Sequence, residues 1–243
     1  MFELLLASVL ALSPPDAAAL LQSADEMRTG MVQTVVSIRA TTRQGDRPDL
    51  VAEFDLYVGG DDRQLVVFTD PKNSGRKLLL RDAKAWLMTP GTTHPVAISA
   101  NQRLSGGASF ADVARVRLAR DFSGRLRPGT EPCDEPPREQ TEPCHVVEIA
   151  ATVRTAPYAA GTLWVDASGR ARRAIYVLPS GKPAKEVRFE YRAQDGRPVL
   201  AKAVIVDLLA GDGKPSTTLE YLRYRRTRLA DELFELPPAP PSP

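Results

Sequence analysis

The chain has 243 residues, of which 43% are hydrophobic and 26% are charged, which excludes an intrinsically disordered protein. No apolar run reaches the roughly 20 residues that a membrane-spanning helix needs. Lys and Arg total 32 against 30 Asp and Glu, so the net charge of +2 does not indicate nucleic acid binding. Only two histidines and two cysteines are present, and we expect neither a metal nor a cofactor.

The first 15 residues resemble a secretory signal peptide. Residues 2–12 are a short apolar stretch followed by Ser13, Pro14 and Pro15. Its length fits a signal sequence and is too short to cross a bilayer. No Lys or Arg precedes the stretch, so the alternative is the first turn of a buried helix. We predict an exported protein with residues 1–15 as its signal peptide.

Residues 16–29 are predicted to form one helix. Asp16 is a good N-cap, strong helix formers follow it, and Gly30 is a stop signal. From residue 31 the apolar residues recur with a period of two, which indicates strands. Residues 100–125 interrupt the strands, and we predict that this segment contains a short helix, or two helical turns, with Ser109 as the N-cap. Ser109 lacks the GxSxG motif of a catalytic serine.

The strand pattern predicts a mainly β (α+β) protein with about eleven antiparallel strands in a single domain, residues 16–236. A sheet of this width is expected to curve into an incomplete barrel, capped by the N-terminal helix and the helical excursion. Residues 237–243 are a proline-rich tail that we expect to be disordered. The predicted strands are residues 32–42, 50–60, 63–71, 76–82, 85–90, 144–152, 161–167, 171–179, 185–193, 198–210 and 217–227, and residues 96–99 are a candidate for one more.

Cys133 and Cys144 flank a polar, proline-rich loop. Their spacing is not that of a CxxC metal or redox motif. A structural disulfide in an oxidising compartment fits this arrangement, and two unrelated thiols are the alternative.

A curved antiparallel sheet with one apolar face suits a hydrophobic ligand. Large apolar residues on many strands are candidates to line such a cavity, although each is also an ordinary core residue. The candidates are Phe54, Phe68, Leu79, Trp86, Phe110, Trp164, Tyr176 and Phe189.

Positive charge gathers in the last third of the chain. Residues 168–228 hold 14 Lys and Arg against 6 Asp and Glu, a net charge of +8. The cluster of Arg223, Arg225 and Arg226 is a candidate face for anionic lipid headgroups or an acidic partner protein. The alternative is a solvated outer face.

Two segments resemble the LolA-like outer-membrane lipoprotein-sorting family. The first is VVFTDPKNSGRKLLLRDAKAWLMTP, with Pro71, Gly75 and Trp86 at its marked positions, and the second is RLSGGASFADVARVRLARDF. The resemblance extends over roughly residues 16–240. It implies a periplasmic protein with an incomplete barrel that holds acyl chains of lipoproteins, and it makes Arg63 the candidate for an arginine that holds the lid closed.

Two functions remain open on these grounds. The first is a periplasmic carrier or chaperone for a lipidated protein or lipid, which delivers its cargo toward the outer membrane. The second is a non-carrier module of an envelope transport or assembly complex that uses the basic face. We expect a monomer with peripheral membrane contact, partnered by cargo and an envelope transporter or outer-membrane acceptor, and no motif indicates an enzyme.

Overall fold

The computed structural model describes most of the chain between residues 16 and 236. The expected signal peptide, Phe110 and the tail from residue 237 onward lie outside the described residues. The described residues are 16–29, 32–60, 63–81, 84–92, 94–99, 103–105, 108–109, 112–113, 116–134, 141–211 and 214–236.

Helix α1 (Ala17–Thr29) begins where the N-cap predicts. The backbone N–H of Ala19 donates to Asp16 Oδ1 at 2.7 Å, which satisfies one of the free amides of the first turn. Leu20, Leu21 and Ala24 form its buried stripe. The apolar residues at helical spacing therefore attach α1 to the rest of the protein. None of the helices in the described ranges is long and apolar enough to span a membrane.

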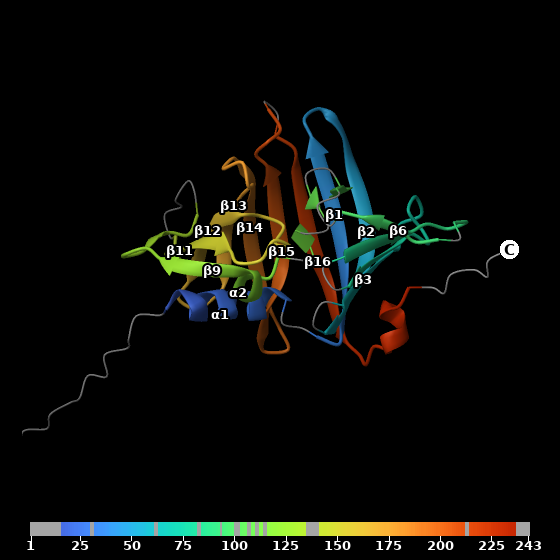
Figure 1. Ribbon diagram of the computed structural model, residues 1–243, viewed down its shortest axis with the longest axis horizontal. Coiled ribbons are helices and arrows are strands. Elements are labelled where there is room, and N and C mark those ends of the chain that lie inside the picture. The colour runs from blue at the N-terminus through green and yellow to red at the C-terminus, as the bar shows by residue number, and fades with distance from the viewer. Residues whose placement is uncertain are drawn as a thin grey trace, which may run out of the picture.

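The body of the protein is one antiparallel sheet of 14 strands that is not closed into a barrel (Figure 1). Along the sheet the order is β10-β11-β12-β13-β14-β15-β16-β1-β2-β3-β4-β5-β6, and β9 pairs with β11. The first strand and the last strand are therefore neighbours in the middle of the sheet. The strands are β1 (Thr34–Gln44), β2 (Arg47–Gly60), β3 (Arg63–Phe68), β4 (Lys77–Arg81), β5 (Lys84–Met88), β6 (Val96–Ile98), β9 (Phe122–Leu126), β10 (Glu131–Pro132), β11 (Pro143–Ala151), β12 (Ala160–Asp166), β13 (Ala171–Val177), β14 (Pro183–Gln194), β15 (Arg197–Asp207) and β16 (Ser216–Arg226).

This architecture confirms the predicted fold class, and β6 confirms the strand predicted at residues 96–99. It adds two short strands that the sequence pattern does not show, β9 and β10, which have five and two residues and both pair with β11. The excursion at 100–125 contains a separate two-stranded sheet, β7 (Arg103–Ser105) and β8 (Ala108–Ser109), then α2 (Leu118–Asp121) and β9. Its described residues are thus less helical than the sequence predicts.

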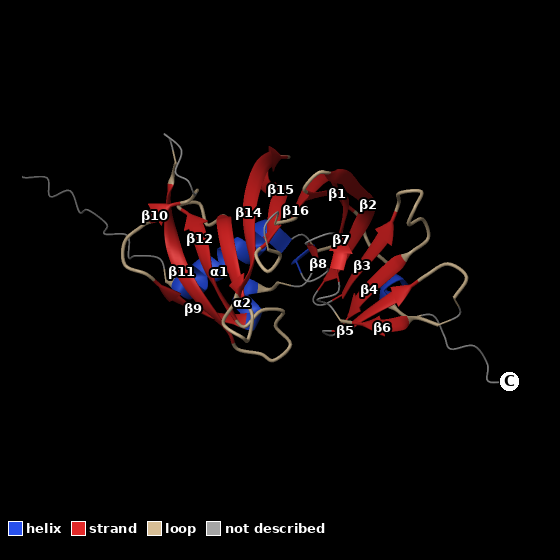
Figure 2. Cartoon of the chain, turned by 90° about the horizontal axis from the view of Figure 1, so that it is seen from above, coloured by secondary structure: helices blue, strands red, loops and turns tan. Residues whose placement is uncertain are grey.

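Two parts of the chain lie over one side of the curved sheet (Figure 2). One is α1, which packs against β9 and β15, and the other is formed by the described residues between 103 and 119, which we call the cover and whose β7 packs against β1 and β2. We call the covered side the inner face; it carries Val36, Phe54, Leu78 and Ala203 of the main buried cluster. The opposite side is the outer face. There a second cluster forms around Leu79 and Phe234 of the short 3-10 helix η2 (Asp231–Phe234).

Candidate ligand cavity

A small cavity lies between the inner face and the cover. Its volume is about 40 Å3, far below the roughly 300–1,000 Å3 of pockets that hold drug-sized ligands. An acyl chain therefore fits here only if the cover moves. The lining residues come from α1, the segment 112–116 and seven strands: Met27, Arg28, Val36, Leu56, Val58, Gln64, Asp112, Val113, Val116, Tyr176, Val187, Phe189, Leu200, Ala203, Ile205, Tyr221 and Tyr224.

Arg28, in the last turn of α1, is a buried cation on the cavity wall. Its side chain is only 5% exposed. One terminal nitrogen donates to the carbonyl of Val116 and lies 3.4 Å from Asp25 Oδ1. Nε has no hydrogen-bond partner within the described part of the chain. The guanidinium thus fastens the cover to α1 and keeps one donor unused.

Asp25 completes this junction between α1 and the cover. Its other oxygen, Oδ2, accepts the backbone N–H of Ala119 at 2.8 Å, in the first turn of α2. A carboxylate at the start of a helix satisfies free backbone amides there. Asp25 and Arg28, three residues apart on α1, therefore hold both a carbonyl and an amide of the 116–119 stretch.

The surroundings of Arg28 keep it charged. Burial alone lowers its pKa, but Tyr176 and Asp25 act in the opposite direction, and the net pKa lies above its ordinary value. Burial raises the pKa of Tyr176 and of Tyr221 to about 12. The cavity wall therefore presents a permanent guanidinium beside neutral phenols.

Gln64 on β3 is the second polar group of the wall without a full set of partners. Its residue is 4% exposed, and Oε1 has no hydrogen-bond partner within the described residues. Leaving a buried polar atom unpaired costs about 1–3 kcal/mol. Both unpaired atoms belong to residues that line the same cavity.

Asp112 anchors the cover to β14 on the inner face. Its carboxylate accepts hydrogen bonds from the backbone N–H of Ser109 (2.7 Å), from the hydroxyls of Ser109 and Tyr158, and from Lys185 on β14. Ser109 Oγ in turn accepts the N–H of Asp112 at 3.4 Å, the reciprocal arrangement of a capping box. Ser109 and Asp112 therefore make the reciprocal contacts of a helix cap, and both carboxylate oxygens of Asp112 are occupied. The helix that Ser109 is predicted to cap falls partly on residues 110–111 and 114–115, which lie outside the described residues.

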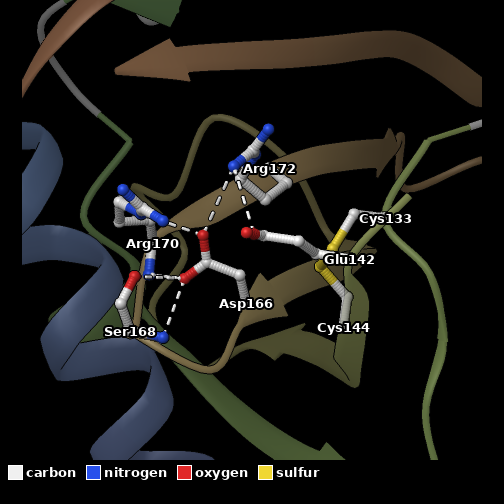
Figure 3. Close-up of polar contacts among 7 residues, drawn as sticks. All are labelled: Cys133, Glu142, Cys144, Asp166, Ser168, Arg170 and Arg172. Carbon is white, nitrogen blue, oxygen red and sulfur yellow. Dashed lines mark hydrogen bonds and ion pairs between the residues drawn. A yellow bond between two sulfur atoms is a disulfide. The ribbon is translucent and has the colours of Figure 1, made fainter. Parts of the chain in front are cut away.

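A hairpin turn supports α1 from outside the cavity (Figure 3). Asp166 accepts the N–H of Ser168 and of Arg170, each at 3.0 Å, and the Nε of Arg170 at 2.9 Å. Burial raises the pKa of Asp166, but the hydrogen bonds from Ser168 and Arg170 outweigh it and hold that pKa below its ordinary value. A Cβ on Gly169 would lie 1.9 Å from Ser23 Oγ of α1, so this turn touches the helix closely.

The predicted disulfide is present and belongs to the same end of the sheet. Cys133 and Cys144 are bonded, with Cα atoms 5.1 Å apart, and both are buried. Arg172 Nη1 lies 3.5 Å from Asp166 and 3.7 Å from Glu142, which stands two residues before Cys144 (Figure 3). Arg172 therefore links the loop that the disulfide closes to the hairpin turn that contacts α1.

The structure divides the expected cavity residues into three groups. Tyr176 and Phe189 line the cavity, and Phe54 and Phe68 lie beside it in the same buried cluster. The other described candidates lie on the outer face, away from the cavity, because successive side chains of a strand point to opposite faces of the sheet. These are Leu79 and Trp86, which pack near Phe234, and Trp164, which packs on the disulfide.

Arg63 has a different place from the one that the resemblance implies. Its Nη1 lies 2.7 Å from Asp231 Oδ1, and its guanidinium lies over the ring of Phe234. Arg63 therefore holds the C-terminal segment on the outer face and contacts no described residue of the cover. Arg28 makes the contact to the cover instead, and its place in the last turn of α1, which equally suits an exposed cation, does not reveal this role in the sequence.

The basic cluster is also divided. Arg223 and Arg225 are exposed on the outer face, opposite Ser37 and Val35 of β1. Arg226 lies at the end of β16 in an open groove with Asp231 and Glu232. The described residues contain no group of three or more His, Cys, Asp or Glu side chains placed to hold a metal ion.

Comparisons with known proteins agree with this architecture. A family model whose description reads "Uncharacterized protein" matches residues 60–237. A LolA superfamily protein of Nitrosomonas europaea has 23% sequence identity and a TM-score of 0.80, over 91% of this chain and 98% of that one. A domain assigned as an outer membrane lipoprotein-sorting protein of Vibrio parahaemolyticus has 16% identity and a TM-score of 0.71, over 90% and 95%. No curated protein matches the chain by sequence.

Proposed function

Because the chain belongs to the family of uncharacterized proteins whose model it matches, and because it has the fold of the LolA superfamily, we propose that it is a periplasmic carrier. In this proposal the inner face shields the acyl chain of a lipid or lipidated protein from water on its way toward the outer membrane. The periplasmic location rests on the signal-like residues 2–12 and on the disulfide.

One observation carries the proposal: an apolar inner face lies under a cover that polar contacts fasten at defined points. The wall is formed by side chains such as Leu56, Phe189 and Leu200 on neighbouring strands. The cover is held by Arg28 to Val116 and by Asp112 to Lys185. A cover of this kind is able to release as a unit without unfolding the sheet beneath it.

The free energy of burying an acyl chain is large enough to displace the cover. Burying ten methylene groups contributes about 8 kcal/mol. A hydrogen bond to a charged group, such as the one from Arg28 to Val116, contributes about 1.5–3 kcal/mol. Chain binding is therefore strong enough to offset the loss of two or three such contacts, and a partner that takes the chain lets the cover close again.

The test is direct detection of bound lipid. The exported protein is purified without detergent and extracted with organic solvent, and the extract is analysed by mass spectrometry. Ala203→Phe fills the cavity wall on β15, and Val204→Phe adds the same ring to the adjacent residue, which points to the outer face. We expect an acyl lipid with the wild type and Val204→Phe, and a loss of at least fivefold with Ala203→Phe.

The proposal also requires uptake from solution. A fluorescent fatty-acyl probe should bind the delipidated wild type and compete with the extracted lipid. A wild-type protein that is purified empty and leaves the probe unbound would overturn the carrier function.

A second function is favoured by the outer face. Several other charges of this face are paired across strands, as in Arg39 with Glu53 at 2.8 Å and Lys202 with Glu190 at 3.3 Å. Arg223 and Arg225 have no ion pair within the described residues. We propose that they contact an acidic surface on an envelope transporter or acceptor. This contact serves either to deliver the cargo or to join a complex in which the protein carries no cargo.

Charge reversal separates these roles. Arg223→Glu/Arg225→Glu should weaken in-cell cross-linking to the envelope partner and leave the bound lipid unchanged. Arg197→Glu/Lys214→Glu is the matched control, with two exposed basic residues elsewhere. Equal cross-linking by both double variants would exclude this surface.

A further inference from the structure

Two residues of the cavity wall each carry an unpaired polar atom, one a donor and the other an acceptor. Arg28 Nε is a donor without an acceptor, and Gln64 Oε1 is an acceptor without a donor. Both side chains are more than nine-tenths buried and both line the cavity. A purely apolar ligand would leave both atoms unpaired, which is costly in a buried site.

Besides Arg28 and Gln64, the polar side chains of the described wall are the phenols of Tyr176, Tyr221 and Tyr224 and the carboxylate of Asp112, and that carboxylate has no capacity left. Asp112 already accepts hydrogen bonds from Ser109, Tyr158 and Lys185. The two buried cations are also balanced, Arg28 by Asp25 and Lys185 by Asp112. An additional charge on the ligand would therefore stay unbalanced in a buried site.

We propose that the cavity recognises an acyl chain at an uncharged amide head group. The amide carbonyl accepts from Arg28 Nε, and the amide N–H donates to Gln64 Oε1. The chain then runs along the apolar wall of Leu56, Phe189 and Ile205. This inference rests on the proposed carrier function and adds the chemical class of its ligand.

The chemistry excludes several close relatives of this ligand. An ester satisfies Arg28 but has no donor for Gln64, and a carboxylate places an acceptor against Gln64 Oε1 and adds a charge. A hydrocarbon satisfies neither residue. Each hydrogen bond in such a site changes affinity by about tenfold.

The test is displacement of a fluorescent acyl probe by three ligands of equal chain length: hexadecanamide, methyl hexadecanoate and hexadecane. With the wild type, we expect the amide to bind about tenfold more tightly than the ester. The ester should in turn bind about tenfold more tightly than the hydrocarbon.

Gln64→Leu should abolish the difference between amide and ester and keep the difference between ester and hydrocarbon. It should also raise the melting temperature of the ligand-free protein, since it replaces a buried unpaired acceptor with an apolar group. Val204→Leu, a change on β15 at a position that faces away from the cavity, should leave all three affinities unchanged. Arg28 is a less clean target because it also holds Val116.

The outcomes separate the two proposals. Equal binding of amide and ester by the wild type would overturn the head-group assignment and leave the carrier function standing, with the two polar atoms serving a buried water molecule instead. Failure of the acyl probe itself to bind would overturn the carrier function.

Discussion

The Lys185 ammonium on β14 and the Asp112 carboxylate of the cover form an ion pair in which Asp112 is 2% exposed and Lys185 is 13% exposed. The two residues are 73 positions apart in the sequence. Removing one partner of a buried pair leaves the other as an uncompensated charge. This pair therefore governs how firmly the cover is attached to the inner face.

Asp112→Asn should destabilise the protein by about 3–5 kcal/mol, because it leaves Lys185 buried without a counter-charge. Urea unfolding measures the loss, and hydrogen exchange should show faster opening of residues 108–119. Glu190→Gln is the matched control, since it breaks an exposed pair with Lys202 and should cost about 1 kcal/mol or less. Equal effects of both variants would contradict the anchoring role of Asp112.

Gly169→Ala should destabilise the protein more than Gly181→Ala. Both glycines lie in hairpin turns with a positive φ, 82° and 79°, so each alanine introduces backbone strain of about 1–2 kcal/mol. Only at position 169 does the new Cβ meet α1, at 1.9 Å from Ser23 Oγ, whereas position 181 has open space. Thermal unfolding compares the two variants; equal shifts would mean that α1 moves aside without cost.

The Cys133→Ala/Cys144→Ala variant should lose about 3 kcal/mol of unfolding free energy, the value that the chain-entropy model gives for a loop of this length. The loss should match that of the wild type measured with a reductant. Because Trp164 packs on the disulfide, its fluorescence should report the same transition. An unchanged urea midpoint would show that the bond adds no stability.

Asp166 predicts a specific pH dependence. Its pKa is lower in the folded protein than in the unfolded chain, so its contribution is fully present above the unfolded value of about 4. That contribution is lost as the pH falls from about 4 through the folded pKa. Urea unfolding between pH 7 and pH 2.5 should show a steeper acid loss for the wild type than for Asp166→Asn. Parallel curves would contradict the lowered pKa.

The alternation of apolar and polar residues predicts both the position and the buried face of the long strands. For short strands it does not predict which residues face the inner side of the sheet. In β2 the alternation of Ala52, Phe54, Leu56 and Val58 with polar residues predicts the inner face correctly, since all four belong to the main cluster. In β4 three consecutive leucines are buried on both faces, and no alternation tells which of them faces inward.

Leu79 and Trp86 illustrate the cause. They are paired across β4 and β5, so they share a face, and that face is buried because Phe234 covers it from about 150 residues further along the chain. Such a tertiary cover has no local signature. The same holds for Arg28, whose position near the end of α1 fits an exposed C-terminal cation as well as a buried one.

The pairing of β1 with β16 has a consequence for how the protein reaches its native state. Thr34 is aligned with Arg226, so the seam in the middle of the sheet joins the two ends of the chain. The cavity wall takes residues from both sides of that seam, including Val36 and Tyr221. Contacts of such high sequence separation form slowly. The inner face is therefore complete only after β16 has been synthesised, and a nascent chain that ends before β16 lacks part of the cavity wall.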